Sequence, residues 1–335
     1  MDNLTNASIG APVRDPAISS IRAIAFLSII ACHIMQYYNC ELAWWFNVGV
    51  QVFLCLSGYL YGQKTITDRL AFYKKQFIKI LVPYYVVITL VIIAQLLFAK
   101  EGISIVRIAN AVLCHGTLSG GEHLWYIPTI LFCYVLTPWF CELNNRIFEK
   151  KRPALHFLIS FVVLSVVVKL FIPYFNPAWI SCFYLGHFLG KNESVRRINR
   201  NMCKGVIYFA AACLISLQIV IQYVLNMKLT GTIGTLFNTM CNYGRAFLGT
   251  SLVLILLDVF RALSIPHPIM KVVAFLDSIS YEGYLVHQFF IFKAFSLLTV
   301  IEQPIIAIAV LLALTAACGL FVKKLQIKIK QFIKF

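Results

Sequence analysis

The sequence has 335 residues, of which 60% are hydrophobic and 13% are charged, with a formal net charge of +16. So much apolar surface excludes a soluble domain, and the long unbroken apolar runs exclude the alternating pattern of an outer-membrane barrel. The composition therefore predicts an all-α, polytopic membrane helix bundle.

Ten apolar runs are long enough to cross a bilayer as helices of about 20 residues. No linker, repeat or low-complexity tract separates them, so we expect one integral-membrane domain over residues 1–335. Because ten is an even number, both termini are expected on the same side of the membrane. The runs are 18–36, 46–62, 80–98, 124–141, 154–173, 178–190, 205–225, 245–262, 279–299 and 303–322.

Lysine and arginine residues gather in every second segment between these runs. The segments on the side of the N-terminus, from Arg14 to Lys334, hold 22 of the 29 basic residues, whereas the opposite segments hold Lys100, Arg107 and Lys228. This distribution follows the positive-inside rule, so both termini are predicted to be cytoplasmic. Topology and anionic membrane lipid then explain the basic charge, and no nucleic-acid partner is expected.

The first run carries two ionisable residues, Arg22 and His33, with ten residues between them. Eleven steps of about 100° bring both side chains to one face of a helix, about 16 Å apart along its axis. Ionisable groups inside a membrane helix are costly, and by default they mark a pathway or a site. The pair therefore predicts a polar channel through the middle of the bundle.

The second run, Asn47–Gly62, mixes small and polar residues into an apolar stretch, and Ser57 and Gly58 allow a close helix approach or a local break. The segment that follows puts Lys75 and Lys79 one helical turn apart at the membrane edge. These lysines are suited to hold phosphate groups, and contact with lipid headgroups fits them equally well.

The later runs add histidines and basic residues but few acids. His187 is interpreted as a packed helix histidine, whereas His287 is equally consistent with packing and with a place in the site. Lys169, Arg245 and Lys293 lie nearer the ends of the runs and are expected to reach the interface or to pair there. A site with cations and imidazoles but few carboxylates suits an anionic ligand and base catalysis.

Several other kinds of site find no support in the sequence. It has no nucleophile elbow, phosphate-binding loop, dinucleotide fingerprint or zinc-protease motif, and its cysteines and histidines lack zinc spacing, so no metal is expected. Most of the eleven cysteines fall inside apolar runs and are interpreted as packing residues. Cys40, Cys114 and Cys241 fall in outer segments, where a disulfide could form.

Five segments, in chain order, resemble signatures of the acyltransferase-3 family of integral-membrane acyltransferases, and together they cover most of the chain. One departure concerns the basic segment, in which the family often has Arg-x-x-Arg before a proline and this chain has Gln76 and Lys79. The segments are the Arg22–His33 pair, Asn47–Leu60, Phe72–Tyr84, His123–Ile127 and Ser280–His287.

The resemblance implies transfer of an acetyl group from cytoplasmic acetyl-CoA to a hydroxyl of a cell-surface carbohydrate, such as O-antigen, capsule or exopolysaccharide. The acceptor is then a carbohydrate or lipid-linked glycan, and the location is a bacterial inner membrane.

Roles for individual residues follow from this resemblance. His33 is expected to be the base, and Arg22 to contact CoA or polarise the thioester carbonyl. Lys75 and Lys79 are expected to meet the CoA phosphates at the inner mouth. An acyl-histidine intermediate on His33 is a less favoured variant. The residues expected to line the substrate path are Asn47, Ser57, Trp125 and His287.

Two other functions fit parts of the same sequence. A transporter or flippase for a lipid-linked sugar would also have about ten spans and a polar central face. Such proteins usually show internal repeats with paired broken helices, which we do not find in this sequence. A non-catalytic scaffold is disfavoured by the intact Arg22–His33 pair. Acetyl-CoA turnover by the purified protein separates these functions.

Overall fold

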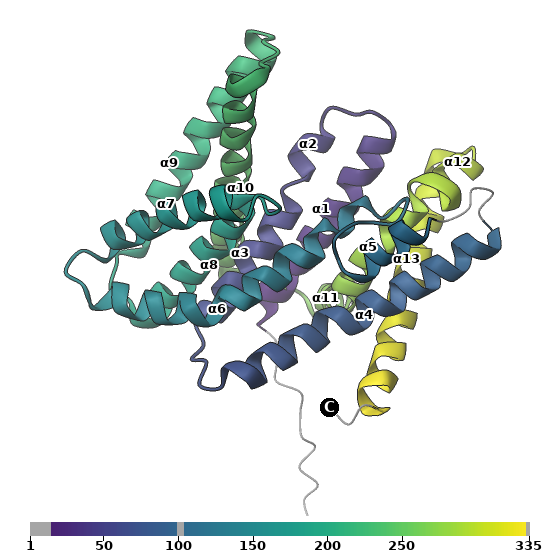
Figure 1. The fold of residues 1–335 in the computed structure, drawn as a ribbon, viewed down its shortest axis with the longest axis horizontal. Coiled ribbons are helices and arrows are strands. Elements are labelled where there is room, and N and C mark those ends of the chain that lie inside the picture. Colours follow the sequence, from purple (N-terminus) through teal and green to yellow (C-terminus); the bar gives the residue numbers. More distant parts are fainter. Residues whose placement is uncertain (1–14, 99–103, 333–335) are drawn as a thin grey trace, which may run out of the picture.

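The computed structural model describes residues 15–98 and 104–332, which leaves Arg14, Lys100 and Lys334 outside the described part. Within these ranges the chain is helical and contains no strand, as the composition predicts. The helices (Figure 1) are α1 (Pro16–Tyr37), α2 (Ala43–Phe46), α3 (Gly49–Gly62), α4 (Arg69–Phe98), α5 (Ile105–Val112), α6 (Tyr126–Glu149), α7 (Pro153–Phe171), α8 (Pro177–Val195), α9 (Arg200–Ile219), α10 (Gly231–Ala262), α11 (His267–Val286), α12 (Leu297–Val300) and α13 (Pro304–Phe332). Short 3-10 or π turns lie at Glu122–Trp125, Val220–Val224, His287–Phe290 and Lys293–Phe295.

Eight stretches of the described chain are helical, long and apolar enough to cross a membrane, with α2 and α3 counted together. The multi-pass helical fold is therefore confirmed, and α8 and α11 take the places of the sixth and ninth predicted spans. The predicted bounds of the ninth span, 279–299, are wrong, because α11 covers His267–Val286. Lys271 and Asp277 interrupt the apolar pattern in the first part of α11, so the expected run begins only at residue 279 and extends into the irregular segment after the helix.

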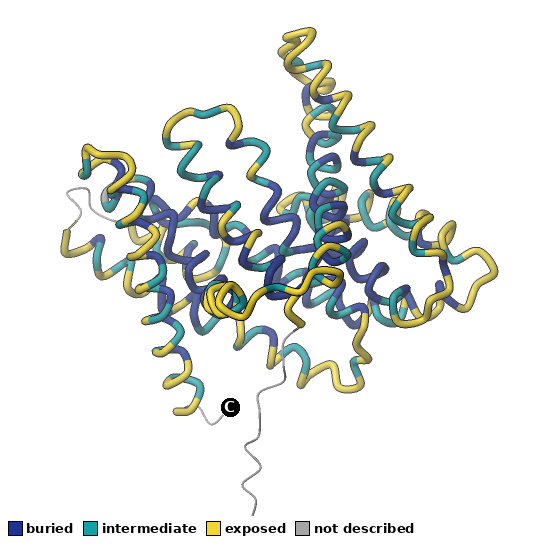
Figure 2. The backbone as a smooth tube through the Cα atoms, turned by 180° about the vertical axis from the view of Figure 1, so that it is seen from behind, coloured by how far each residue is buried: buried dark blue, intermediate teal, exposed yellow. Residues whose placement is uncertain are grey.

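The buried centre of the bundle differs sharply from its edge (Figure 2). In the apolar stretch of the α2–α3 pair 61% of the residues are buried, compared with 11% in α7 and 17% in the stretch that includes α9. The exposed aliphatic side chains of α7 and α9 form the kind of surface that faces lipid. Polar and ionisable side chains, which lipid does not tolerate, are therefore placed on the central helices.

Helices α3 and α8 pack so closely that backbone meets backbone. Gly58 and Gly62 on α3 face α8, and Gly186 and Gly190 on α8 face α3, each pair with the spacing of small-residue contacts in membrane helices. A Cβ atom on Gly58 would lie 2.0 Å from a carbonyl oxygen of α8, and one on Gly186 would lie 2.1 Å from a carbonyl oxygen of α3. The close approach predicted at Gly58 is confirmed.

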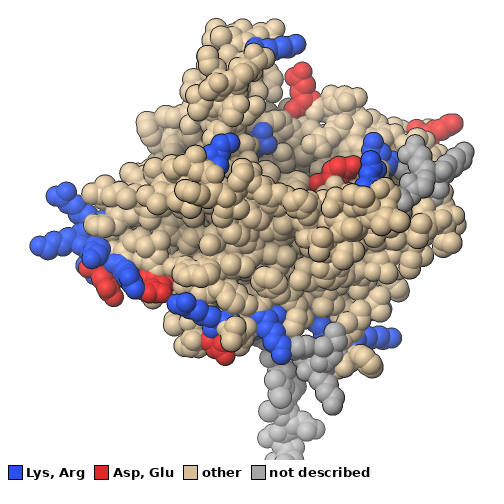
Figure 3. All heavy atoms as spheres, viewed as in Figure 1, with Lys and Arg blue, Asp and Glu red and all other residues tan. Residues whose placement is uncertain are grey.

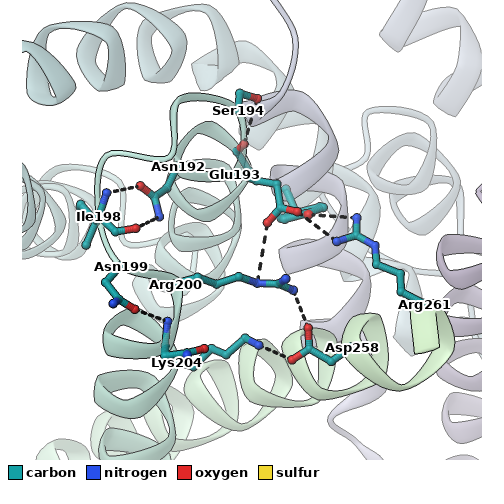
Figure 4. A network of polar contacts seen from close by, with 12 residues as sticks. Asn192, Glu193, Ser194, Ile198, Asn199, Arg200, Lys204, Asp258 and Arg261 are labelled. Carbon is teal, nitrogen blue, oxygen red and sulfur yellow. Dashed lines mark hydrogen bonds and ion pairs between the residues drawn. The ribbon is translucent and has the colours of Figure 1, made fainter.

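One end of the bundle, which we call the basic end, carries lysine and arginine side chains along its edge. Figure 3 shows many of them along the lower edge of this face, below a broad uncharged surface. An ion-pair network joins α8, α9 and α10 at this end (Figure 4). Arg200 contacts Asp258 at 2.6 Å, and Lys204 pairs with the same carboxylate. Arg261 contacts Glu193 at 3.0 Å.

Candidate active site

A cavity of about 290 Å³ lies toward the basic end between α1, α3, α4, α6, α11 and α13. It brings together three residues that the sequence analysis singled out, namely Arg22, Ser57 and Lys79. The polar face predicted for the first helix therefore borders a cavity. Residues that sequence reasoning did not place in a site complete the charged wall, namely Asp277, Glu282, Lys323 and Lys330.

Arg22 is held in the cavity wall by Asp277 of α11. The guanidinium Nη1 lies 3.6 Å from Asp277 Oδ1, and Ser19, nearly one turn earlier on α1, donates its hydroxyl to Oδ2 at 2.9 Å. The side chain of Asp277 is 2% exposed and that of Arg22 is 26% exposed, so the cation still faces the cavity. The buried carboxylate thus orients the guanidinium before any ligand arrives.

The wall of this cavity has an excess of positive charge. Four cationic side chains and two carboxylates line it. Of the carboxylates, Asp277 is paired with Arg22, and Glu282 accepts a hydrogen bond from Gln326 of α13. A wall of this composition suits a polyanionic ligand, and phosphate groups are the ligands that lysine and arginine side chains bind best.

Three histidines from separate parts of the chain gather beyond the cavity. His33 belongs to α1, His123 precedes α6, and His287 follows α11. The ring centres of His33 and His287 are 5.2 Å apart, and those of His123 and His287 are 4.8 Å apart. His33 is half-buried, whereas the other two are buried. The structure therefore joins His287 to the predicted base and adds His123, which sequence reasoning quoted in a motif without giving it a role.

Hydrogen bonds select the tautomers of two of these rings. Nδ1 of His287 lies 2.7 Å from the carbonyl oxygen of Tyr284, and Nδ1 of His33 lies 2.7 Å from Oε1 of Gln36. The carbonyl oxygen of Tyr284 only accepts hydrogen bonds, so Nδ1 of His287 carries the proton and its Nε2 keeps the lone pair. With the amide oxygen of Gln36 facing the ring, His33 has the same tautomer. Among the described residues, Nε2 of His287 has no hydrogen-bond partner.

His123 positions its neighbours in this cluster. Its two ring nitrogens face Oε1 of Gln288 and the carbonyl oxygen of Tyr284, and its own carbonyl accepts from the Tyr284 hydroxyl. With both nitrogens engaged, the ring is not open to a substrate.

Over residues 15–98 and 104–332, no group of three or more His, Cys, Asp or Glu side chains is arranged to hold a metal ion.

The cavity and the histidine cluster follow one another along α1. Ile29 lines the cavity, and His33 lies one helical turn, about 6 Å, further from the basic end. Tyr284 joins the two, since it lines the cavity and its carbonyl binds His287. Arg22 and His33 are about 16 Å apart along the helix, so a ligand must be extended to reach both.

Three of the residues singled out in the sequence lie apart from this arrangement. Lys75 is exposed on α4 and does not line the cavity. Asn47 lies between α2 and α3, and Trp125 stacks on Trp179 with ring centres 3.8 Å apart. His187 is fully buried in α8 and contacts Cys141 and Asn144 of α6. All eleven cysteines are free thiols, so the outer disulfide is not formed.

Comparison with known proteins assigns most of the chain to one family model. A model described as an acyltransferase domain matches residues 15–323. No curated protein and no solved structure gives a match. The matched range includes the residues that form the charged cavity wall up to Lys323 and all three histidines of the cluster.

Proposed function

Since the chain belongs to the acyltransferase-3 family of membrane acyltransferases, we propose that it moves an acetyl group from acetyl-CoA to a hydroxyl of a cell-surface carbohydrate. The acceptor is a polysaccharide or a lipid-linked glycan. The protein lies in a bacterial inner membrane with the basic end and both termini in the cytoplasm. The observation that carries this proposal is the succession of a cationic cavity and two histidines that each keep a lone pair.

The cavity suits the phosphate end of the donor. CoA carries its phosphates and its thioester at opposite ends of a flexible pantetheine arm. Arg22, Lys79 and Lys323 offer the countercharges for the phosphates, and a cytoplasmic basic end would admit the donor from the side where it is made. The arm then runs along α1 past Ile29 toward His33.

The distance between Arg22 and His33 decides between the two roles expected for Arg22. Because Arg22 and His33 are about 16 Å apart, the guanidinium cannot polarise a carbonyl that reacts beside His33. Of the two roles expected from the resemblance, we therefore assign Arg22 the contact with CoA. Asp277 holds the guanidinium for that contact.

His33 is the general base in this proposal. Its Nε2 takes the proton of the acceptor hydroxyl as the hydroxyl oxygen attacks the thioester carbonyl, and the CoA sulfur leaves with that proton. The half-buried ring is open to an acceptor, and Gln36 keeps the proton on Nδ1. The open Nε2 of His287 can accept a hydrogen bond from the same acceptor.

The test is the change His33→Ala in cells that lack their own copy of the gene. We expect the acetyl content of the surface polysaccharide, measured by mass spectrometry, to fall by about a hundredfold or more. His156→Ala is the matched control, because His156 is an exposed histidine on α7 outside the cavity and the cluster. Near-normal acetylation by the His33→Ala protein would remove His33 from the site. A purified protein that does not turn over acetyl-CoA would favour sugar transport instead.

A further inference from the structure

A second group of reactive side chains lies toward the basic end, where α6 meets α8. Sγ of Cys141 is 3.3 Å from Nε2 of His187, and the amide nitrogen Nδ2 of Asn144 is 2.8 Å from Nδ1 of the same ring. A thiol, an imidazole and an orienting amide in this order form the arrangement that activates cysteine nucleophiles. The transfer reaction proposed above uses none of these residues.

The thiol of this group is accessible, and its partners are fixed. Cys141 is half-exposed, whereas His187 and Asn144 are fully buried. Cys141 and His187 line a cavity of about 360 Å³ that is separate from the one beside Arg22. Glu142, in the same wall, is paired with two arginines. Three cationic side chains complete the wall, namely Lys64, Arg69 and Lys191.

The imidazole can take the proton of the thiol. In the structure Nδ2 of Asn144 faces Nδ1 of His187, and the hydroxyl of Tyr184 donates to Oδ1 of Asn144 at 3.3 Å. Because that hydroxyl can accept from the amide and donate to Ser160 instead, the amide can turn its oxygen toward the ring. With the amide oxygen accepting from Nδ1–H, the lone pair of His187 Nε2 faces the thiol of Cys141.

We propose that Cys141 is a self-acylation site that takes an acyl group from acyl-CoA as a thioester, an inference that rests on the proposed CoA donor. Sγ of Cys141 forms a bond to the acyl carbon as its proton passes to Nε2 of His187. The bond between that carbon and the CoA sulfur breaks, and the sulfur takes up the proton. One thioester replaces another, so no further reactant is needed. The three cations of the wall face the CoA phosphates.

The acyl group on Cys141 is a modification and not a step of the outward transfer. On α6, Cys141 follows Tyr134 by seven residues and Tyr126 by 15, and both tyrosines line the first cavity. Cys141 therefore lies about 22 Å along α6 from Tyr126, which is at the end of the cavity next to the histidine cluster, and this is too far for direct delivery to His33. An acyl chain on Sγ also removes the contact between Cys141 and His187 that links α6 to α8.

The experiment uses the purified full-length protein and labelled acetyl-CoA without an acceptor. We expect label on the peptide that contains Cys141, and neutral hydroxylamine should release it as it does other thioesters. Cys141→Ala should abolish this label, and His187→Gln should lower it by about a hundredfold, the usual contribution of a general base. Cys203→Ala is the matched control, because Cys203 is also half-buried in a basic cavity, but no histidine lines that cavity.

The outcomes separate this inference from the proposed function. A His33→Ala protein should lose carbohydrate acetylation and keep the thioester on Cys141. Active carbohydrate acetylation with no label on Cys141 would overturn the self-acylation site alone. If the wild-type protein showed neither carbohydrate acetylation nor label on Cys141, the proposal that CoA is the donor would also be overturned. If His187→Gln does not fold, the rates of alkylation by iodoacetamide are compared in the wild-type protein. We expect Cys141 to react faster than Cys203. Equal rates would overturn the inference.

Discussion

Replacing Gly186 by alanine tests the backbone contact between α3 and α8. The new Cβ atom would lie 2.1 Å from the carbonyl oxygen of Cys55 and 2.8 Å from the carbonyl carbon, whereas ordinary van der Waals contact begins at 3.4 Å. Both atoms belong to the backbone of α3, so no side-chain rotation relieves the clash. The difference between 3.4 and 2.1 Å requires the helices to separate by about 1.3 Å.

A gap of that size is costly in a membrane protein. A separation of about 0.5–1 Å already removes a quarter to a half of each dispersion contact. Helices in lipid have no hydrophobic attraction that would replace those contacts. Overpacking a tight core costs about 1–3 kcal/mol and occasionally more, and alanine gains about 1 kcal/mol in helix propensity over glycine. Because the clash is with backbone, we expect a net destabilisation of about 2 kcal/mol.

Thermal unfolding of the purified protein in detergent measures this effect. For a chain of 335 residues, a loss of about 2 kcal/mol corresponds to a melting temperature about 3 °C lower. Gly205→Ala on α9 is the matched control, because no atom lies within 4 Å of a Cβ atom built there. The control should melt at the wild-type temperature or slightly above it. A Gly186→Ala protein that melts like the wild type would refute the reasoning.

Two further predictions concern the candidate active site. Lys79→Gln should raise the half-saturating acetyl-CoA concentration by about tenfold, since one charge-assisted contact is worth about 1.5 kcal/mol. Lys75→Gln, one turn away on α4 but outside the cavity lining, should leave it unchanged, and equal effects of the two changes would contradict the placement of the donor. Gln36→Leu should lower kcat roughly tenfold or more without the same change in KM, because the ring of His33 loses the acceptor that orients it. Gln36→Glu keeps an accepting oxygen and should restore kcat, and a loss equal to that of Gln36→Leu would exclude this role.

The periodicity of the first helix was enough to predict the shared face of Arg22 and His33, because a helix repeats every few residues whatever surrounds it. The partner of Arg22 was missed for a local reason. The predicted ninth span begins two residues after Asp277, so the sequence pattern places this carboxylate outside the membrane spans. In the structure Asp277 lies in the middle of α11, where neighbouring helices shield it from lipid and Arg22 compensates its charge.

The sequence does not predict that the lysines of α13 line the site, because membrane topology alone already explains their positions. Lys323 and Lys330 follow the positive-inside rule, and that rule accounts for them without a ligand. Only the packing of α13 against α11 and α4 shows that both line the same cavity as Arg22. Long-range contacts of this kind leave no trace in local sequence, whereas the glycine spacing that joins α3 to α8 does.

The depth of each group in the bundle connects the fold with the proposed chemistry. Arg22 and its cationic neighbours lie nearer the basic end, and His33 lies about 16 Å further along the same helix. An acetyl-CoA molecule that enters from the basic end can therefore reach His33 only if its thioester enters first and its phosphates remain near Arg22. An acceptor that stays outside the membrane needs only to reach the half-buried ring of His33 from the other end. Because α1 carries both groups on one rigid face, the acetyl group can pass from donor to acceptor without a large movement of the helices.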